Sequence, residues 1–559
     1  MSQCDRLCKP TLAIQESFGR LTQTSTVYSF ITGKTFTVGY AWDAASNLTS
    51  MTDPQGGSTT YTYDTLNRLA TVKNPQRDQF TFTYDALGRR TQLARPNSVN
   101  TNYHYDPLSR VTSLLHQYTT NKGATTTLDG AQYSYDAAGN RLSKTDKLTN
   151  IVSNYAYDPL YELTTVTQGP NTTESYSYDA VGNRLSSLNV PAYTYNASNE
   201  LTAQTGVTDA YDNNGNLLSK TDALGTTYSW DFENRLTRVA PSGGSQVNFK
   251  YDPMGRRIQK SSSSGTVNYI YDHANVLEEV DTAGTLVTRY TQGFGIDEPL
   301  AMLKSGTTSY YEADGLGTVT SLSNSSGALA KTYSYDSFGR LLSSSGTIAS
   351  PYGFTGRELD SETGLMEYRA RYYDPSLGRF ISEDSLRFGG DVDFYAYVHN
   401  NSLNLIDPWG YCADKEGQKD TSDCTAAVLS AVNKQFGTKF TPGDVIRNFM
   451  NPEPPAAGAG FNVIVSASNL PPAQFNAIQT GRYPLSLTTQ LTGYGPTLHI
   501  AGPGALNPDA RFSNSNVGGV MSVTFTAHLD SAFPYNPAGL LFHVLKDLLG
   551  VGGRNPCPY

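Results

Sequence analysis

The chain has 559 residues, of which 50 are glycine, 38 are tyrosine and only 16% are charged. Disordered chains are poor in aromatic residues and coiled coils need long apolar heptads, so both classes are excluded. The net charge of −9 lacks the basic footprint of a nucleic-acid-binding protein, whereas abundant Tyr, Thr, Ser and Gly favour a β-rich, turn-rich fold.

Residues 1–29 form an N-terminal segment without a recognisable pattern. They have neither the basic start nor the apolar stretch of a secretory signal, so no signal peptide is expected. No run of about 18 apolar residues exists, and no transmembrane segment is expected. No cysteine lies between Cys8 and Cys412, so no disulfide framework holds the middle of the chain.

A motif of the form aromatic–any–aromatic–Asp recurs in the region 30–345, as in YTYDTLNR, YSYDAAGNRL and YSYDSFGRLL. Its acidic position is occupied by Asp43, Asp64, Asp85, Asp106, Asp136, Asp158, Asp179, Asp212, Asp231, Asp252 and Asp272, and once by Asn196. The mean spacing is about 21 residues, which allows two short strands per repeat.

Each repeat predicts a β-hairpin. Two aromatic residues separated by one position share a face of a strand, because strand side chains alternate. The Asp then opens a turn by accepting backbone N–H groups, and the Gly or Asn that follows tolerates a positive φ. Stacked hairpins share a tyrosine-lined face and form a long sheet that coils. These Tyr and Asp residues are therefore interpreted as structural.

After the repeats, GLMEYRARYYDPSLGRFISED (364–384) is followed by NLIDPWG (404–410). With these two motifs, the chain resembles the Rhs/YD-repeat polymorphic toxin family. The resemblance implies a mostly β fold: a cocoon-like β-shell over residues 30–345, a core plug over 346–410 and a variable C-terminal toxin domain over 411–559.

The resemblance also implies that the core cuts its own chain beside the DPxG motif, by means of aspartates. Matched by position, these are Asp384 and Asp407, with Arg379 near the first. The family usually has Pro where Ser385 stands, and Leu where Tyr411 stands.

Self-cleavage is also plausible from the chemistry of the residues. Two neighbouring carboxyl groups do not both ionise easily, so one can act as a general acid while the other activates water. The structural alternative is a pair of turn-forming aspartates, with Pro408 and Gly410 shaping the turn.

Beyond Gly410 the repeat motif stops and the charges balance, which disfavours a nuclease. The pattern predicts a small α+β domain. Helices are expected over 423–437, 441–450, 470–481 and 538–550, and strands over 461–468, 496–502 and 520–530.

Two sets of residues in this domain are candidates for chemistry. His499, His528, Asp530 and His543 form the first set, with Asp547 beside it. His528 and Asp530 share a strand face, and an antiparallel neighbour strand would bring His499 beside His528. Such a set suits a divalent metal such as zinc, or a metal-free His–Asp acid–base pair. The alternative is that these are ordinary strand-end and helix histidines.

Cys424 is the second candidate, as a nucleophile near a helix N-terminus, where the dipole favours the thiolate. A distant histidine would complete a cysteine-hydrolase arrangement. The alternatives are a buried helix cysteine, or a disulfide from Cys424 to Cys412 or Cys557.

We therefore expect a polymorphic toxin made in the bacterial cytoplasm and then secreted or delivered against bacteria or host cells, with a hydrolase as its payload. By resemblance, its partners are a cognate immunity protein and a delivery apparatus. The alternative function is a non-enzymatic surface or adhesion scaffold whose tail binds or perturbs membranes through the amphipathic segment 538–550.

Overall fold

The computed structural model describes residues 8–15, 20–385, 392–411, 414–415, 461–468, 510–517 and 520–529. These residues form antiparallel strands and short 3₁₀ helices, such as Phe354–Gly356 and Val398–Asn400, with no α-helix among them. Within the same residues, no helix has the length and apolar character that crossing a bilayer requires.

Two 16-stranded sheets make up the shell, and within each sheet every strand pairs with the next in sequence. The first sheet contains β1 (Cys8–Gln15), β2 (Leu21–Tyr28), β3 (Phe36–Trp42), β4 (Leu48–Thr52), β5 (Ser58–Tyr63), β6 (Leu69–Lys73), β7 (Gln79–Tyr84), β8 (Arg90–Ala94), β9 (Val99–Tyr105), β10 (Val111–Thr119), β11 (Thr125–Tyr135), β12 (Arg141–Asp146), β13 (Val152–Tyr157), β14 (Leu163–Gln168), β15 (Asn171–Tyr178) and β16 (Arg184–Ser187). Strands β1 and β2 thus extend the sheet into the segment before residue 30.

The second sheet contains β17 (Tyr193–Tyr195), β18 (Leu201–Gln204), β19 (Val207–Tyr211), β20 (Leu217–Lys220), β21 (Thr226–Trp230), β22 (Leu236–Ala240), β23 (Val247–Tyr251), β24 (Arg257–Ser262), β25 (Gly265–Asp272), β26 (Asn275–Val280), β27 (Leu286–Gln292), β28 (Pro299–Lys304), β29 (Thr307–Ala313), β30 (Val319–Ser323), β31 (Leu329–Tyr335) and β32 (Leu341–Ser345). These sheets confirm the predicted coiled β-shell.

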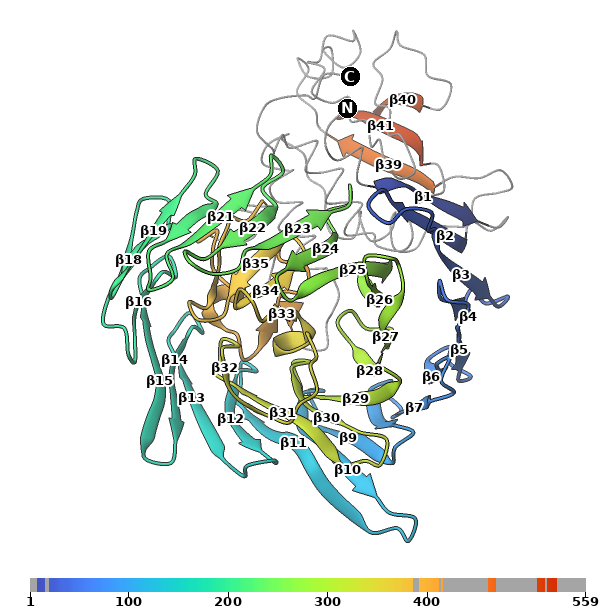
Figure 1. The fold of residues 1–559 in the computed structure, drawn as a ribbon, viewed down its shortest axis with the longest axis horizontal. Coiled ribbons are helices and arrows are strands. Elements are labelled where there is room, and N and C mark those ends of the chain that lie inside the picture. The colour runs from blue at the N-terminus through green and yellow to red at the C-terminus, as the bar shows by residue number, and fades with distance from the viewer. Residues whose placement is uncertain are drawn as a thin grey trace.

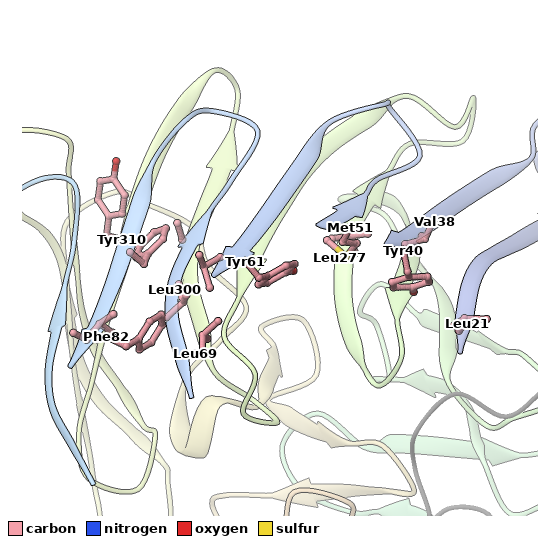
Figure 2. Packing of buried hydrophobic residues seen from close by; sticks show 14 residues of the cluster. Leu21, Val38, Tyr40, Met51, Tyr61, Leu69, Phe82, Leu277, Leu300 and Tyr310 are labelled. Atoms are coloured by element: carbon pink, nitrogen blue, oxygen red, sulfur yellow. The ribbon is translucent and has the colours of Figure 1, made fainter. Parts of the chain in front are cut away.

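The ribbon of strands coils back onto itself (Figure 1). Strands β25–β31, the second winding, pack against β2–β15, the first winding. The Tyr28 hydroxyl donates to the Tyr269 carbonyl at 2.7 Å, and Asn97 donates to the Ser323 hydroxyl at 2.8 Å. Figure 2 shows the apolar side of this contact, where Met51 and Tyr61 of the first winding share one cluster with Leu277 of the second.

The predicted Asp turn is confirmed in detail at Asp64. One carboxylate oxygen accepts the backbone N–H groups of Leu66 and Arg68, at 2.9 and 3.0 Å, while Asn67 adopts a φ of 57°. Asp272 departs from this pattern, because a two-residue turn follows it and its carboxylate accepts the Tyr40 hydroxyl instead, at 2.7 Å.

The second aromatic residue of the motif links one repeat to the repeat before it. The Tyr84 hydroxyl donates to the Leu69 carbonyl at 2.8 Å, and the same bond recurs from Tyr63 to Leu48 at 2.9 Å. Arg68 lies over the Tyr84 ring, with its guanidinium carbon 4.6 Å from the ring centroid. Hydroxyl, ring and guanidinium together fix the stacking of successive hairpins.

Within residues 20–345, the ladder of paired strands is interrupted between β16 and β17, at a break that we call the seam. One backbone bridge, between Ser187 and Val190, remains there, with bonds of 2.8 and 3.0 Å. Side chains add to it: the Ser187 and Tyr193 hydroxyls lie 2.9 Å apart, and Arg184 donates to the Leu377 carbonyl at 2.9 Å. Leu377 belongs to the core segment and packs against Tyr193 and Leu201. The core thus supports the wall where strand pairing stops.

The coil surrounds a four-stranded core sheet made of β33 (Glu358–Asp360), β34 (Leu365–Tyr368), β35 (Arg371–Asp374) and β36 (Arg379–Phe380) (Figure 1). A short pair follows, β37 (Leu405–Ile406) with β38 (Asp414–Lys415). Arg257 of the shell is buried and forms ion pairs with Glu358 at 2.7 Å and Asp360 at 2.5 Å. A buried ion-pair network therefore fixes the core sheet to the wall.

Three further strands form a separate sheet in the order β39 (Phe461–Ser468), β41 (Val520–Leu529) and β40 (Ala510–Val517). Strands β39 and β41 confirm two predicted strands, whereas β40 was not predicted, because ARFSNSNV is polar and lacks apolar alternation. The four helices and the strand 496–502 expected after Gly410 lie outside the described residues.

Candidate active site

Arg371, the first residue of β35, joins the two predicted aspartates. Its Nη2 lies 3.1 Å from Asp384 Oδ2 and 3.4 Å from Asp407 Oδ2. Asp384 and Asp407 are only 4% and 2% exposed, so these charges interact away from bulk water. The guanidinium also lies 3.6 Å from the Phe380 ring centroid, which fixes its plane. The structure therefore brings both carboxylates to one cation.

The peptide bond between Gly410 and Tyr411 is held from both sides. Arg371 Nε donates to the Gly410 carbonyl at 2.6 Å. Asp407 Oδ1 accepts the N–H groups of Gly410 at 2.8 Å and Tyr411 at 3.0 Å. A carbonyl next to a cation and an amide next to a carboxylate are the groups that peptide hydrolysis needs.

Glycine is required at position 410 for two reasons. Its φ is +73°, in the left-handed region that favours glycine. A Cβ at this position would clash with the carbonyl oxygen of Tyr368 and would approach the backbone nitrogen of Arg371 to 3.1 Å. Gly410 and Tyr411, which we call the junction, therefore lie directly against the turn between β34 and β35.

The two aspartates also affect the pKa of the Tyr411 hydroxyl. Burial, followed by the negative charges of Asp384 and Asp407, raises the pKa of its hydroxyl above the ordinary value, and Arg371 opposes this shift. The tyrosine hydroxyl is therefore protonated at neutral pH, and it lies in the electrostatic field of both carboxylates.

Arg379 does not occupy the place predicted for it. Its guanidinium donates to the Asn199 carbonyl at 2.7 Å, lies 3.5 Å from Asp393 and stacks near Tyr195. The arginine between the aspartates is Arg371. Nearness to Asp384 in sequence favoured Arg379, whereas the fold brings Arg371 in from the opposite side of a hairpin. The crowded motif RARYYD was the signal that could have suggested it.

Of the candidate residues after Gly410, only His528 lies among the described residues, near the end of β41. The residue opposite it on β39 is Asn462, and β40 is the other neighbour of β41, so neither neighbour is the strand expected to carry His499. His499, Asp530, His543, Asp547 and Cys424 lie outside the described residues. The zinc set and the cysteine nucleophile stay predictions.

The turns and the core sheet described above have counterparts in known families. The teneurin YD-shell family matches residues 135–402, and the RHS repeat family matches residues 42–79. These matches place the shell and core, residues 42–79 and 135–402, in the Rhs/YD-repeat family. Both matches fall within the repeat shell and the core segment.

Curated relatives of this Rhs/YD-repeat chain include two bacterial proteins. The tRNA3(Ser)-specific nuclease WapA of Bacillus spizizenii is 35% identical over 230 residues, which are 39% of this chain and 10% of WapA. Double-stranded DNA deaminase toxin A of Burkholderia cenocepacia is 24% identical over 319 residues, which are 50% of this chain and 22% of that protein. The chain thus spans about a tenth and a fifth of their lengths.

Among solved structures, TcdB2-TccC3 without its hypervariable C-terminal region superposes with a TM-score of 0.60 at 19% identity. The superposition covers 72% of this chain and 24% of that one. At this identity the likeness establishes the fold of the Rhs shell and leaves activity to the chemistry of the site.

Proposed function

We propose that this chain is the shell and core of a polymorphic toxin, and that the core hydrolyses the Gly410–Tyr411 peptide bond to separate residues 411–559 from the shell. The observation that carries this proposal is the pair of hydrogen bonds to that peptide bond: Arg371 donates to its carbonyl, and Asp407 accepts from its N–H group. Asp384, bound to the same guanidinium nitrogen as Asp407, is the second carboxylate that the reaction needs.

In the proposed reaction, Asp384 accepts a proton from water as the oxygen of that water bonds to the Gly410 carbonyl carbon. Negative charge then develops on the carbonyl oxygen, where Arg371 Nε stabilises it. In the reactive state the two neighbouring carboxyl groups hold one proton between them, and this proton passes from Asp407 to the Tyr411 nitrogen as the carbon–nitrogen bond breaks. The products are a carboxylic acid at Gly410 and an amine at Tyr411, and solvent exchange restores the protons of the two carboxyl groups.

The matched experiment compares Asp407→Asn with Asp393→Asn in the full chain. Asp393 is also buried, but its arginine partner is Arg379. Denaturing electrophoresis and N-terminal sequencing should show a fragment that starts at Tyr411 for the parent chain and for Asp393→Asn, and an intact chain for Asp407→Asn. Cleavage of Asp407→Asn at the parent rate would refute the role of this carboxylate.

We further propose that residues 411–559 are the toxic part, a hydrolase that acts through His528, Asp530 and His543. The names of the relatives, a tRNA nuclease and a DNA deaminase toxin, support a toxin and make nucleic acid one candidate target. A delivery apparatus and a cognate immunity protein are the partners that such a toxin requires. Expressing the full chain and its His528→Ala variant in a susceptible cell tests this, because equal killing by both would exclude His528.

A further inference from the structure

The turn between β34 and β35 holds the two residues that precede Gly410. Tyr368 pairs with Arg371, so the turn consists of Arg369 and Ala370, and Arg369 adopts a φ of +56°. Arg369 Nη1 donates to the Pro408 carbonyl, and its guanidinium stacks 4.9 Å from the Trp409 ring centroid.

A backbone bond adds to this grip, because the Ala370 N–H donates to the Trp409 carbonyl at 3.2 Å. Pro408 and Trp409 are therefore held through their carbonyl groups and through one ring. Since Gly410 follows directly, this grip sets where the Gly410 carbonyl lies beneath Arg371.

Asp297 of the shell holds this turn in place. It lies in the loop between β27 and β28, is buried and has a φ of +56°, an uncommon conformation for a residue other than glycine. Its carboxylate binds Arg369 through two bonds, Nη2 to Oδ1 at 2.7 Å and Nη1 to Oδ2 at 3.1 Å. Arg357 of the core pairs with the same Oδ1 at 2.6 Å.

These contacts form a chain from the wall to the junction. Asp297 binds Arg369, and Arg369 binds Pro408 and Trp409. These contacts reach Pro408 and Trp409, the two residues that precede Gly410. Both are thus positioning residues, because they act through the backbone that they hold.

We infer that Asp297, through Arg369, positions the junction for cleavage, so that the chain is cut only when the second winding is in place around the core. This inference rests on the proposed self-cleavage. A bound geometry displaced by about 1 Å lowers the rate of a reaction about 100-fold, so loss of the Asp297–Arg369 pair is expected to slow cleavage on that scale.

The test is a double-mutant cycle in the full chain with Asp297→Asn and Arg369→Gln, read as the rate of appearance of the 411–559 fragment. Each single variant is expected to slow cleavage about 100-fold, and the double variant no more than either one. The pH at which the rate is half-maximal should stay unchanged, because Asp384 and Asp407 still perform the proton transfers. Multiplying effects in the double variant would overturn the inference.

Asp53→Asn is the matched control, because Asp53 is also a buried shell aspartate and pairs with Arg289 at 2.9 Å. It should cleave at the parent rate. If Asp297→Asn lowers the unfolding temperature more than Asp53→Asn does, its slower cleavage could reflect lost stability. The cleavage rate of Arg369→Gln then tests the positioning role by itself, because this variant leaves Asp297 paired with Arg357. A parent chain that never cuts would refute the proposed function itself, whereas parent-like cutting by both single variants would refute only the positioning role.

Discussion

Arg371 Nε lies 2.6 Å from the carbonyl oxygen of Gly410, although 39 residues separate the two in sequence. The bond holds the positively charged guanidinium of Arg371 against the carbonyl of Gly410, the last residue before the unrelated C-terminal sequence. The contact draws electron density toward the Gly410 carbonyl oxygen and makes the carbonyl carbon more electrophilic.

Replacing Arg371 tests the value of that charge. Arg371→Gln removes the cation from the carbonyl, and cleavage should slow by about 100- to 1,000-fold, as when an oxyanion donor is lost. Arg379→Gln is the control, because that buried arginine binds Asn199 and Asp393 instead. The rate of fragment appearance measures both variants. Equal slowing by both would show that the loss reflects general damage to the core.

Replacing Gly410 tests the tight fit of the junction. Gly410→Ala places a Cβ against the Tyr368 carbonyl and forces a non-glycine residue to a φ of +73°. Gly88→Ala is the matched control, since Gly88 has a φ of +82° and nothing within 4 Å of the added Cβ. The free energy of unfolding of the control should fall by the cost of the left-handed φ alone, about 1–2 kcal/mol. Gly410→Ala should lose more stability and should also stop cleavage.

A rise in pH from 4.5 through 7 should loosen the contact between the windings at Glu312. Burial raises the pKa of this carboxyl to about 7, while Arg95 of the first winding opposes the shift. The folded state therefore binds a proton more tightly than the unfolded state, whose carboxyl titrates near 4.5. The resulting stability is fully present below pH 4.5 and is lost as the pH rises through 7.

Glu312→Gln should remove this dependence, because the amide is neutral at every pH. The unfolding temperature of the parent chain should fall between pH 5 and pH 8 more steeply than that of the variant, by a few degrees. Glu362→Gln is a useful contrast, because the pKa of Glu362 is lowered to about 2 through Lys260. An unchanged slope in Glu312→Gln would contradict the assignment.

Truncating Leu377 should weaken the seam. Leu377→Ala leaves a cavity behind Tyr193 and should lower the free energy of unfolding by about 2–4 kcal/mol. Amide exchange in β17 and β18 should speed up at the same time, because backbone pairing to β16 is missing there. Leu365→Ala, a change at a buried residue in the same cluster as Tyr372, should cost similar stability without this local exchange. Identical exchange maps would exclude a special role for Leu377.

The repeats could be predicted because their signal is local. The Asp turn at Asp64 and the alternation around Tyr61 and Tyr63 depend on residues within one hairpin, so the pattern specifies strand, turn and buried face. Asp384 and Asp407 were found only through resemblance to a family. Arg371 and Asp297 were missed, because their positions depend on how the core sheet and the second winding pack, and no spacing rule encodes that.

The contacts between the two windings join residues far apart in sequence, 216 positions for Arg95 with Tyr311 and 170 for Lys144 with Asp314. During translation, residues are added at about 5–20 per second, so the first winding leaves the ribosome roughly 10–40 s before the strands that cover it. Through that interval its tyrosine face is open to solvent and to other nascent chains. Production of this protein should therefore depend on chaperone capacity, and every strand of the wall has left the ribosome before the last quarter of the chain has been synthesised.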